Sequence, residues 1–253
     1  GGAGGDGGNG LLRGIGGNGG PGGDAAGGAI FFGGDTLTVV NSTIARGTAQ
    51  AGNGGNGGIG DPGLATSHGG NGGDGGAAAG GLVRSVPVLG APSANFDFTT
   101  FAEGEVTGGA PGSGGTAKAP GAAGLPGPAD GAALLPDKPV TIRSTAIVGS
   151  SSHALCNANV FADAGSSNLA QDASCGANLH ASLDAVFRPL TENAALPTYM
   201  PLYASAVIDS AASCNDSNLI PVSTDGVSTP RPQGEACDIG AIEADYVFVD
   251  DFN

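Results

Sequence analysis

Large side chains and basic charge are both scarce in this sequence of 253 residues. It has no tryptophan, one methionine and 5% aromatic residues, so a thick hydrophobic core is hard to build and the interior must be narrow and repetitive. Eight Lys and Arg residues against 23 Asp and Glu give a formal charge of −15. That balance disfavours binding to nucleic acid or to an anionic membrane surface. No apolar run reaches the length of a transmembrane segment.

Glycine, in contrast, occurs 51 times, nearly three times its usual share of about 7%. This argues against a helical fold, since Gly costs roughly 1 kcal/mol per helix position relative to Ala. The glycines form GGx triplets within 1–28 and 52–80, and a looser Gly/Pro/Ala pattern over 108–133. Three residues is the period of polyproline II, which predicts polyglycine-II-like packing. A flexible linker is the alternative.

Short strand-like stretches lie between the glycine blocks, at 35–47, 82–90, 95–106 and 138–151. Aligning LTVVNSTIARG with VTIRSTAIVGS places Val39 near Ile142 and Ile44 near Ile147. Two copies of one strand–corner–strand unit are typical of solenoid coils, which bury their apolar rows only against neighbouring coils. At about 20–25 residues per repeat, we expect five coils. Asn41, at a corner, is expected to join a ladder of hydrogen bonds with neighbouring coils.

Cysteine occurs only in the C-terminal part of the chain. The even number and the lack of any metal-type spacing indicate two disulfides, and hence a secreted, extracellular or cell-surface protein. The sequence alone permits three pairings, of which sequential pairing is the simplest. The chain starts at Gly1 in mid-repeat without a signal peptide, so we expect a mature or truncated product. The four residues are Cys156, Cys175, Cys214 and Cys237.

Three strings carry a family resemblance: SSNLAQDASC (166–175), SAVIDSAASC (205–214) and STPRPQGEACDIGAIE (228–243). They resemble secreted bacterial parallel β-helix proteins of the choice-of-anchor type. The resemblance implies a right-handed parallel β-helix with a capped C-terminal end, and the pairs Cys156–Cys175 and Cys214–Cys237. SAVIDS departs from the commoner SPAID, and 52–133 is richer in Gly than usual. The GGx blocks are also similar to PGRS-type glycine-rich surface proteins.

Candidate cofactor sites are weak. GIGGNG (14–19) fits a dinucleotide fingerprint but lacks a flanking strand and helix. GGxGxD fits the start of a calcium-binding β-roll repeat, yet its apolar position is filled by Gly or Ala, so a roll has no core. We expect the aspartates of these triplets to point to water and no cofactor to be bound. The weak calcium candidates are Asp6, Asp24 and Asp74.

Parallel β-helices often host polysaccharide lyases and hydrolases, which need clustered carboxylates beside Arg or Lys. Here the basic residues are spread singly, and Arg231 is expected to pair with Asp238 or Glu243. The histidines show no metal spacing. We therefore predict that the protein is not an enzyme. The aspartates that flank the first disulfide loop are predicted to lie in surface turns: Asp163, Asp172 and Asp184.

The predicted fold is all-β: a right-handed parallel β-helix with polyglycine-II-like inserts and a disulfide-stapled, loop-rich cap. Solenoid coils occupy 1–151, the last coils and cap 152–245, and a strand-like tail 246–253. The predicted function is that of a secreted fibre, surface-layer or adhesin-like protein that assembles head to tail through an exposed solenoid end and this tail. The assembly residues are Tyr246, Val247, Phe248 and Val249.

Other functions remain open at this point. A module that binds ice or surface glycans would use a flat face of outward threonines, for which the candidates are Thr36, Thr38 and Thr43. A polysaccharide-active β-helix enzyme is a further alternative, although the sequence names no carboxylate cluster for it.

Overall fold

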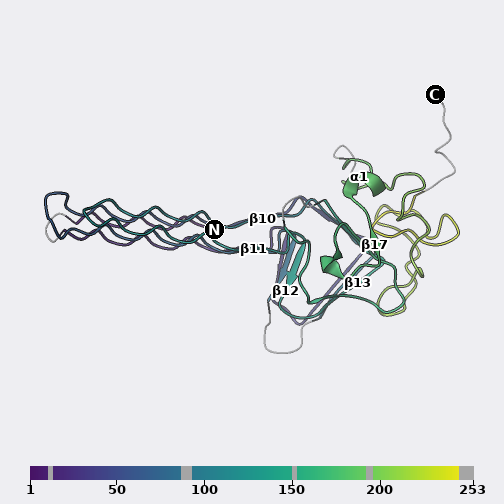
Figure 1. Cartoon of the computed structure of the whole chain (residues 1–253). Coiled ribbons are helices and arrows are strands. Elements are labelled where there is room, and N and C mark those ends of the chain that lie inside the picture. The colour runs from purple at the N-terminus through teal and green to yellow at the C-terminus, as the bar shows by residue number, and fades with distance from the viewer. Residues whose placement is uncertain (11–13, 87–92, 150–152, 192–195, 245–253) are drawn as a thin grey trace, which may run out of the picture. The chain divides into compact units, whose positions relative to one another are not determined.

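The computed structural model describes residues 1–10, 14–86, 93–149, 153–191 and 196–244 (Figure 1). The chain passes alternately through two compact units. The glycine unit consists of Gly1–Gly28, Thr48–Ala79 and Val106–Asp130, and the strand unit of Ala29–Gly47, Gly80–Glu105 and Gly131–Asn253. No helix in the described part of the chain is long and apolar enough to cross a membrane. The predicted tail strand Tyr246–Val249 lies outside the described residues.

Parallel sheets build the strand unit, as the all-β prediction requires. Their strand orders are β12-β7-β2, β15-β13-β8-β3 and β17-β16-β14-β9-β4, so strands from successive passes of the chain lie side by side, as solenoid coils do. The first sheet contains β2 (Ile30–Phe32), β7 (Val83–Ser85) and β12 (Leu134–Pro136); the second β3 (Thr36–Val40), β8 (Ser93–Asp97), β13 (Val140–Arg143) and β15 (Val160–Ala162); the third β4 (Thr43–Ala45), β9 (Thr100–Ala102), β14 (Ala146–Val148), β16 (Leu169–Ala170) and β17 (Leu179–His180).

The core of the strand unit consists of apolar columns. Val39 pairs in register with Phe96, and Phe96 with Ile142; a second column joins Ile44, Phe101 and Ile147 in the same way. The predicted alignment is therefore confirmed, with one further coil between the two copies. The Phe96 and Phe101 rings meet edge to face with centroids 5.0 Å apart, and both side chains are fully buried in this narrow interior.

The coils turn at stacked positions with left-handed backbone. Asn41, Phe98 and Ser144 have φ values of 52°, 48° and 47°. Each is the first residue after a strand, β3, β8 or β13, and the last residues of these strands are in register. Because Phe98 occupies the position next to Asn41, the predicted ladder at Asn41 is wrong. The Asn41 amide instead donates to the Thr224 carbonyl at 2.6 Å, which ties this corner to the C-terminal loops.

The predicted repeat of 20–25 residues holds for only part of the chain. The register places Ile30 beside Val83 and Val83 beside Leu134, so the first two coils span about 50 residues each, twice the length of a typical solenoid repeat. The reason is that each of them includes a glycine-rich excursion. Val140 pairs with Val160, only 20 residues on, and the longest sheet stacks five strands, which agrees with the predicted five coils. The helical content is small: η1 (Ala173–Cys175) and α1 (Leu183–Val186).

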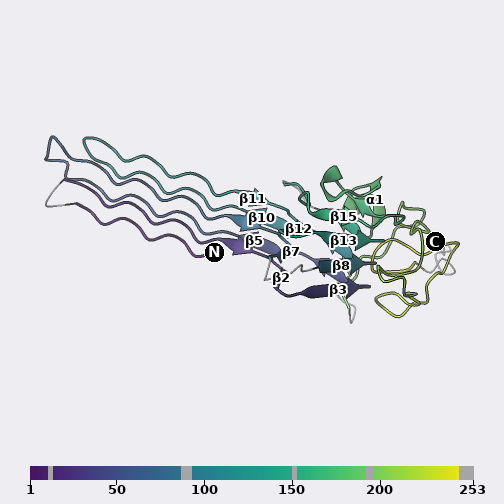
Figure 2. The same cartoon turned by 90° about the horizontal axis from the view of Figure 1, so that it is seen from below.

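Extended segments build the glycine unit, and Figure 2 shows them running side by side. The short strands β1 (Ala25–Ala26), β6 (Ala78–Ala79) and β11 (Ala129–Asp130) form one parallel sheet, and β5 (Thr48–Gln50) pairs with β10 (Glu105–Thr107). Beyond these strands the segments are linked by hydrogen bonds between backbones and by hydrogen bonds from backbone N–H groups to Asn and Asp side chains. We name them A (1–10), B (14–24), C (51–60), D (68–77), E (108–116) and F (119–128).

Hydrogen bonds between the segments recur every three residues. The first glycine of each triplet donates to the next segment of its own layer: Gly54 and Gly57 of segment C donate to Ala110 and Ser113 of segment E, at 2.9 and 2.8 Å. This links A, C and E into one layer and B, D and F into another. The second glycine donates to the other layer, as Gly55 does to the Gly20 carbonyl at 2.8 Å.

In the middle of the bundle, as in segment C, glycine is required at both positions because the backbones nearly touch. A Cβ on Gly55 would lie 2.1 Å from the Gly5 carbonyl oxygen, and one on Gly54 would lie 2.0 Å from the Gly73 oxygen. Real Cβ atoms do not approach backbone oxygens this closely. The third position of the triplet faces outward and accepts other residues, which accounts for the GGx pattern.

Gly55→Ala is expected to destabilise the glycine unit, because the new methyl group forces segments A and C apart. Overpacking of this kind costs about 1–3 kcal/mol, which calorimetry detects as a lower melting temperature. Gly8→Ala is the matched control, since its Cβ meets nothing within 4 Å. Equal melting temperatures for the two variants would contradict the close packing.

Candidate functional site

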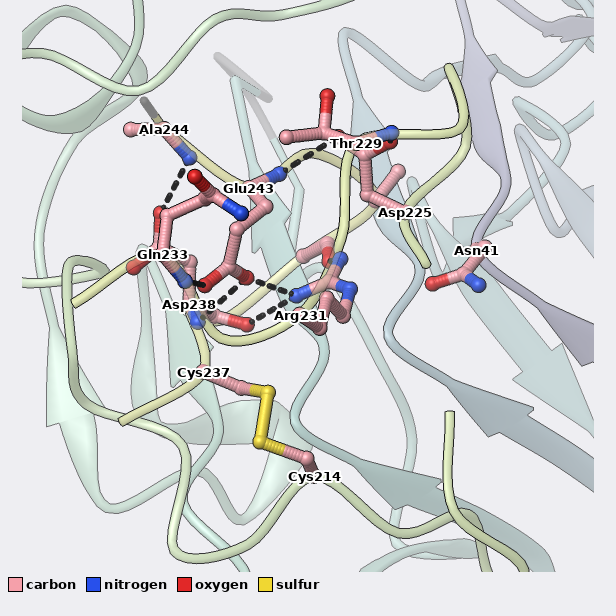
Figure 3. Close-up of polar contacts among 12 residues, drawn as sticks. Asn41, Cys214, Asp225, Thr229, Arg231, Gln233, Cys237, Asp238, Glu243 and Ala244 are labelled. Atoms are coloured by element: carbon pink, nitrogen blue, oxygen red, sulfur yellow. Dashed lines mark hydrogen bonds and ion pairs between the residues drawn. A yellow bond between two sulfur atoms is a disulfide. The ribbon is translucent and has the colours of Figure 1, made fainter. Parts of the chain in front are cut away.

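The RPQG–CDIGA–E motif builds a buried ion pair (Figure 3). Arg231 Nη1 donates to Glu243 Oε2 at 2.7 Å, and the two side chains are 0% and 1% exposed. The guanidinium also donates to the carbonyls of Asp238 and Gly240, at 3.0 and 2.8 Å, and lies over the Phe98 ring, 4.6 Å from its centroid. The predicted pairing with Glu243 is confirmed. Asp238 contributes its backbone carbonyl to the same guanidinium.

The carboxylates around this pair bind backbone N–H groups of their own loops. Glu243 accepts from the amides of Gln233 and Asp238, both at 3.0 Å. Asp238 accepts from Asp209 and Ala244, both at 2.8 Å. Burial raises the pKa of Asp238 to about 6. These carboxylates thus supply hydrogen-bond acceptors to buried loop amides that are not paired in a strand or helix.

Asp225 is a residue of this cluster that the sequence analysis missed. Its Oδ1 accepts from Val227 and Thr229 at 2.9 and 2.7 Å, and its Oδ2 accepts from the Glu243 amide at 2.9 Å. The string Asp-Gly-x-Ser-Thr at 225–229 is typical of an Asx turn, and this signal was available. The link to Glu243 was not, because it joins loops that are distant in sequence.

Two disulfides fasten the C-terminal loops. They join Cys156 to Cys175, with Cα atoms 5.0 Å apart, and Cys214 to Cys237, with Cα atoms 5.6 Å apart. These are the pairs that the family resemblance implies. Cys237 directly precedes Asp238, so the second disulfide anchors the loop that holds the buried ion pair (Figure 3).

Two of the three predicted surface-turn aspartates have structural partners instead. Asp163 forms an ion pair with Arg143, whose side chain is 8% exposed. Asp172 accepts from the Leu155 amide at 3.0 Å and caps η1 through the Ser174 amide at 2.9 Å. Asp163 does begin a turn, closed by the Ser166 amide at 3.0 Å, and its side chain is 30% exposed. The prediction omitted the partners of both aspartates, because these partners depend on which segments the coils bring together. Asp184 lies exposed in the first turn of α1.

The weak calcium candidates belong to a ladder of side chains on the glycine unit. Asp6, Asp24 and Asp74 are exposed, but each Oδ1 accepts a backbone N–H from the neighbouring segment at 2.7 Å. Within the described ranges, no group of three or more His, Cys, Asp or Glu residues could hold a metal ion. An Asn or Asp recurring at the third triplet position was the sequence signal for this ladder, and it was missed. The asparagines that accept a backbone N–H in the same way are Asn9, Asn18, Asn53, Asn56 and Asn71.

The remaining candidate motifs do not form sites of the expected type. GIGGNG (14–19) runs along segment B, where Gly16 and Gly19 donate to His68 and Asn71 of segment D, and no helix follows it. Of the candidate threonines, Thr36 and Thr38 are both exposed on one face of β3, whereas Thr43 lies on β4 in another sheet and is half-buried.

A cleft of about 370 Å³ in the strand unit lies beside the Asn41 corner. Hydroxyl, amide and apolar groups line it, and none of the lining side chains is titratable. This lining suits an uncharged polar ligand and offers no acid or base. The lining residues are Asn41, Ser42, Thr43, Leu196, Pro197, Thr198, Gly226, Ala241 and Ile242.

Comparison with known proteins gives little further information. No protein family matches the chain, and no curated protein matches it. A solved structure described as a nine polyproline type II helical bundle springtail antifreeze protein, from Granisotoma rainieri, is 25% identical. The match covers 42% of this chain and 91% of that chain, with a TM-score of 0.12. A score this low carries no argument about the present chain.

Arg231→Met is expected to destabilise the strand unit by about 3–5 kcal/mol, because it leaves the buried Glu243 carboxylate without its counter-charge. Arg46→Met is the control: Arg46 and Glu103 form an ion pair whose side chains are 50% and 36% exposed, and such pairs contribute less than about 1 kcal/mol. Urea unfolding followed by near-UV circular dichroism of the buried Tyr199 measures both. Similar losses in the two variants would contradict a structural role for the buried pair.

The stability of the strand unit is expected to fall as the pH rises from about 4 to about 6. The pKa of Asp238 is raised from 3.8 to about 6, so the folded state binds a proton in this window that the unfolded state has released. Burial raises the pKa of Asp97 as well, which acts in the same direction. Melting temperatures at pH 4.5 and 7.5 test this, with Asp238→Asn predicted to flatten the difference. A higher melting temperature at pH 7.5 would refute the assignment.

Proposed function

We propose that this protein is a secreted bacterial structural protein of the adhesin or fibre type, built as a right-handed parallel β-helix that carries a polyglycine-II-like bundle. The observation behind the proposal is the three-residue hydrogen-bond repeat between the glycine segments. Polyproline II has this period but no internal hydrogen bonds. A single segment of this kind therefore has no hydrogen bonds of its own to stiffen it. Hydrogen bonds to neighbouring segments in two directions stiffen the whole bundle, and a stiff bundle suits a structural protein.

Two features support a role outside the cell. The structure holds its cysteines in two disulfides, which persist in oxidising compartments. The motif strings at 166–175, 205–214 and 228–243 resemble those of secreted choice-of-anchor proteins. The bundle itself needs no metal or cofactor, since its polar backbone groups bind one another.

The proposal assigns no catalytic role. Three buried titratable groups with shifted pKa values, Asp97, Asp238 and Arg231, bind loop backbone or one another. A fourth, Tyr199, donates its hydroxyl hydrogen bond to Glu103. The cleft beside Asn41 is lined without titratable groups. A carbohydrate-active enzyme needs a pair of free carboxylates facing a groove, and the described residues provide none in these places.

Self-assembly is part of the proposal. Strands β2, β3 and β4 each stand at one end of their sheets, so one edge of each is unpaired within the described residues. Such an edge pairs readily with another strand. The tail Tyr246–Val249, which lies outside the described residues, is the proposed partner strand from a second copy, and head-to-tail pairing gives a filament.

Electron microscopy of the purified protein tests this assembly. The full chain is expected to form filaments at high concentration, and a chain lacking 246–253 is expected to form none. Filaments of equal length with and without the tail would rule out the tail as the partner strand. Dispersed particles from the full chain at every concentration would rule out the filament.

Binding of a repetitive ligand, such as ice or a surface polysaccharide, is a second candidate. The third residues of the triplets form outward rows on parallel segments, and the spacing along a row is about 9 Å for three residues of polyproline II. Rows that include Asn56, Ser113 and Asn71 are anchored by the side-chain ladder. Thermal hysteresis and a glycan array discriminate these ligands from a purely structural role, and no response in either assay excludes the candidate.

A further inference from the structure

Asparagine is followed directly by glycine at five places in the sequence, and all five lie in the glycine unit. Each of these asparagines stands at the third position of a triplet, so the residue after it is the first glycine of the next triplet. No asparagine elsewhere in the sequence is followed by glycine. The five are Asn9, Asn18, Asn53, Asn56 and Asn71.

An Asn–Gly pair is chemically labile in a flexible chain. The backbone nitrogen of the glycine loses its proton and attacks Cγ of the asparagine. A bond from this nitrogen to Cγ forms, the bond from Cγ to the side-chain nitrogen breaks, and ammonia leaves. Water then opens the resulting five-membered ring at one of its two carbonyls, which gives aspartate or isoaspartate. The reaction therefore consumes one water and releases one ammonia.

In the glycine unit, one residue of the adjacent segment holds both reacting groups. The Gly54 N–H donates to the Ala110 carbonyl at 2.9 Å, and the Ala110 N–H donates back to Asn53 Oδ1 at 2.9 Å. We call these two hydrogen bonds the Asn–Gly clamp. The other four pairs make the same clamp: Asn56–Gly57 on Ser113, Asn18–Gly19 on Asn71, Asn71–Gly72 on Ala122, and Asn9–Gly10 on Ile59.

The clamp opposes ring closure in two ways. The glycine proton that must be lost is engaged in a hydrogen bond, and the asparagine side-chain oxygen is bound to the neighbouring segment. Ring closure also brings the glycine nitrogen into line with the asparagine Cβ, whereas extended polyproline-II-like backbone keeps them apart. The five asparagines are exposed, so the clamp and not exclusion of water must provide the protection.

We propose that the five Asn–Gly pairs are deamidation sites that the folded bundle keeps unreacted, and that the bundle accepts aspartate but not isoaspartate as the product. Aspartate already makes the same side-chain contact at Asp6, Asp24 and Asp74, where Oδ1 accepts a backbone N–H at 2.7 Å. Isoaspartate carries the chain through its side-chain carbon, which adds a CH₂ group to the main chain. This addition shifts the three-residue period on which the glycine contacts depend.

Peptide mapping by mass spectrometry after incubation at mildly alkaline pH tests the protection. Asn53 and Asn56 of the folded chain are expected to deamidate about tenfold or more slowly than in a synthetic peptide of residues 51–60 in the same buffer, because two hydrogen bonds must break first. Equal rates in chain and peptide overturn the proposal, and this comparison needs no variant.

Ala122→Pro assigns the protection to the clamp. It removes the N–H that Asn71 Oδ1 accepts at 3.0 Å, at a triplet position where Pro21 and Pro128 already occur. Deamidation of Asn71 is expected to become about two- to tenfold faster, the factor that one hydrogen bond corresponds to, while Asn53 stays slow. An unchanged rate at Asn71 would show that the clamp does not protect it.

Ala123→Pro is the matched control. The Ala123 N–H bonds no described residue, and prolines already stand at the equivalent positions 120 and 126. Asn71 should therefore react as in the parent chain. Equal acceleration at Asn71 in both proline variants would mean that a loosened segment, and not the lost hydrogen bond, controls the rate.

The fate of the products tests the second part of the proposal. Asn53→Asp is expected to melt at the temperature of the parent chain, whereas Asn53→Ala is expected to melt lower because it leaves the Ala110 N–H without its acceptor. Equal losses in the two variants would contradict the tolerance of aspartate. Isoaspartate, detected by enzymatic methylation, should be depleted from the folded fraction after incubation. Finding it there in the same proportion as in the peptide would overturn its exclusion.

Discussion

The glycine unit depends on the absence of Cβ atoms between neighbouring backbones. An extended chain cannot satisfy its own N–H and C=O groups, so each must find a partner in another segment or in water. At bond lengths near 2.8 Å between segments, even a methyl group collides with a neighbouring carbonyl. Two glycines in every triplet supply two directions of hydrogen bonding, and their entropic cost, the largest of any residue, is offset by bonds repeated along each segment.

A third set of hydrogen bonds involves the third residue of each triplet. The backbone N–H of this residue donates to the side chain of an Asn or Asp at the third position of the adjacent segment, as that of Ala110 does to Asn53 at 2.9 Å. Only an acceptor oxygen is used, which is why Asn and Asp both serve. The acidic composition is thus partly structural, since Asp6, Asp24 and Asp74 stabilise the bundle that they also keep soluble.

The strand unit solves a different problem. Its stacked strands bury apolar columns, but the loops that follow β17 have little regular structure and must satisfy buried backbone in another way. Asp225, Asp238 and Glu243 accept loop amides. Arg231 forms an ion pair with Glu243, and the Cys214–Cys237 disulfide holds the loop in place. Polar and ionic contacts therefore replace a hydrogen-bonded ladder at this end of the fold.

Sequence patterns predicted individual strands and motifs better than they predicted which distant segments lie beside one another. The Val39–Ile142 and Ile44–Ile147 alignment followed from apolar spacing, and the Arg231–Glu243 pair from opposite charges in one short motif. The repeat length was wrong for the first two coils because glycine excursions lengthen them, and periodicity within a segment does not reveal which coil contains it. The Asp6 contact and the Asn41–Thr224 bond were missed because each depends on which distant segment lies alongside.

Residue-resolved hydrogen exchange on segment C measures the central claim most directly. Inter-segment bonding predicts that the amides of Gly54, Gly55, Gly57 and Gly58, all donors to segments B and E, exchange far more slowly than the same residues in an unstructured Gly-rich peptide. Exchange at the peptide rate would show that the glycine triplets form a flexible linker, and the bundle described above would not exist in solution.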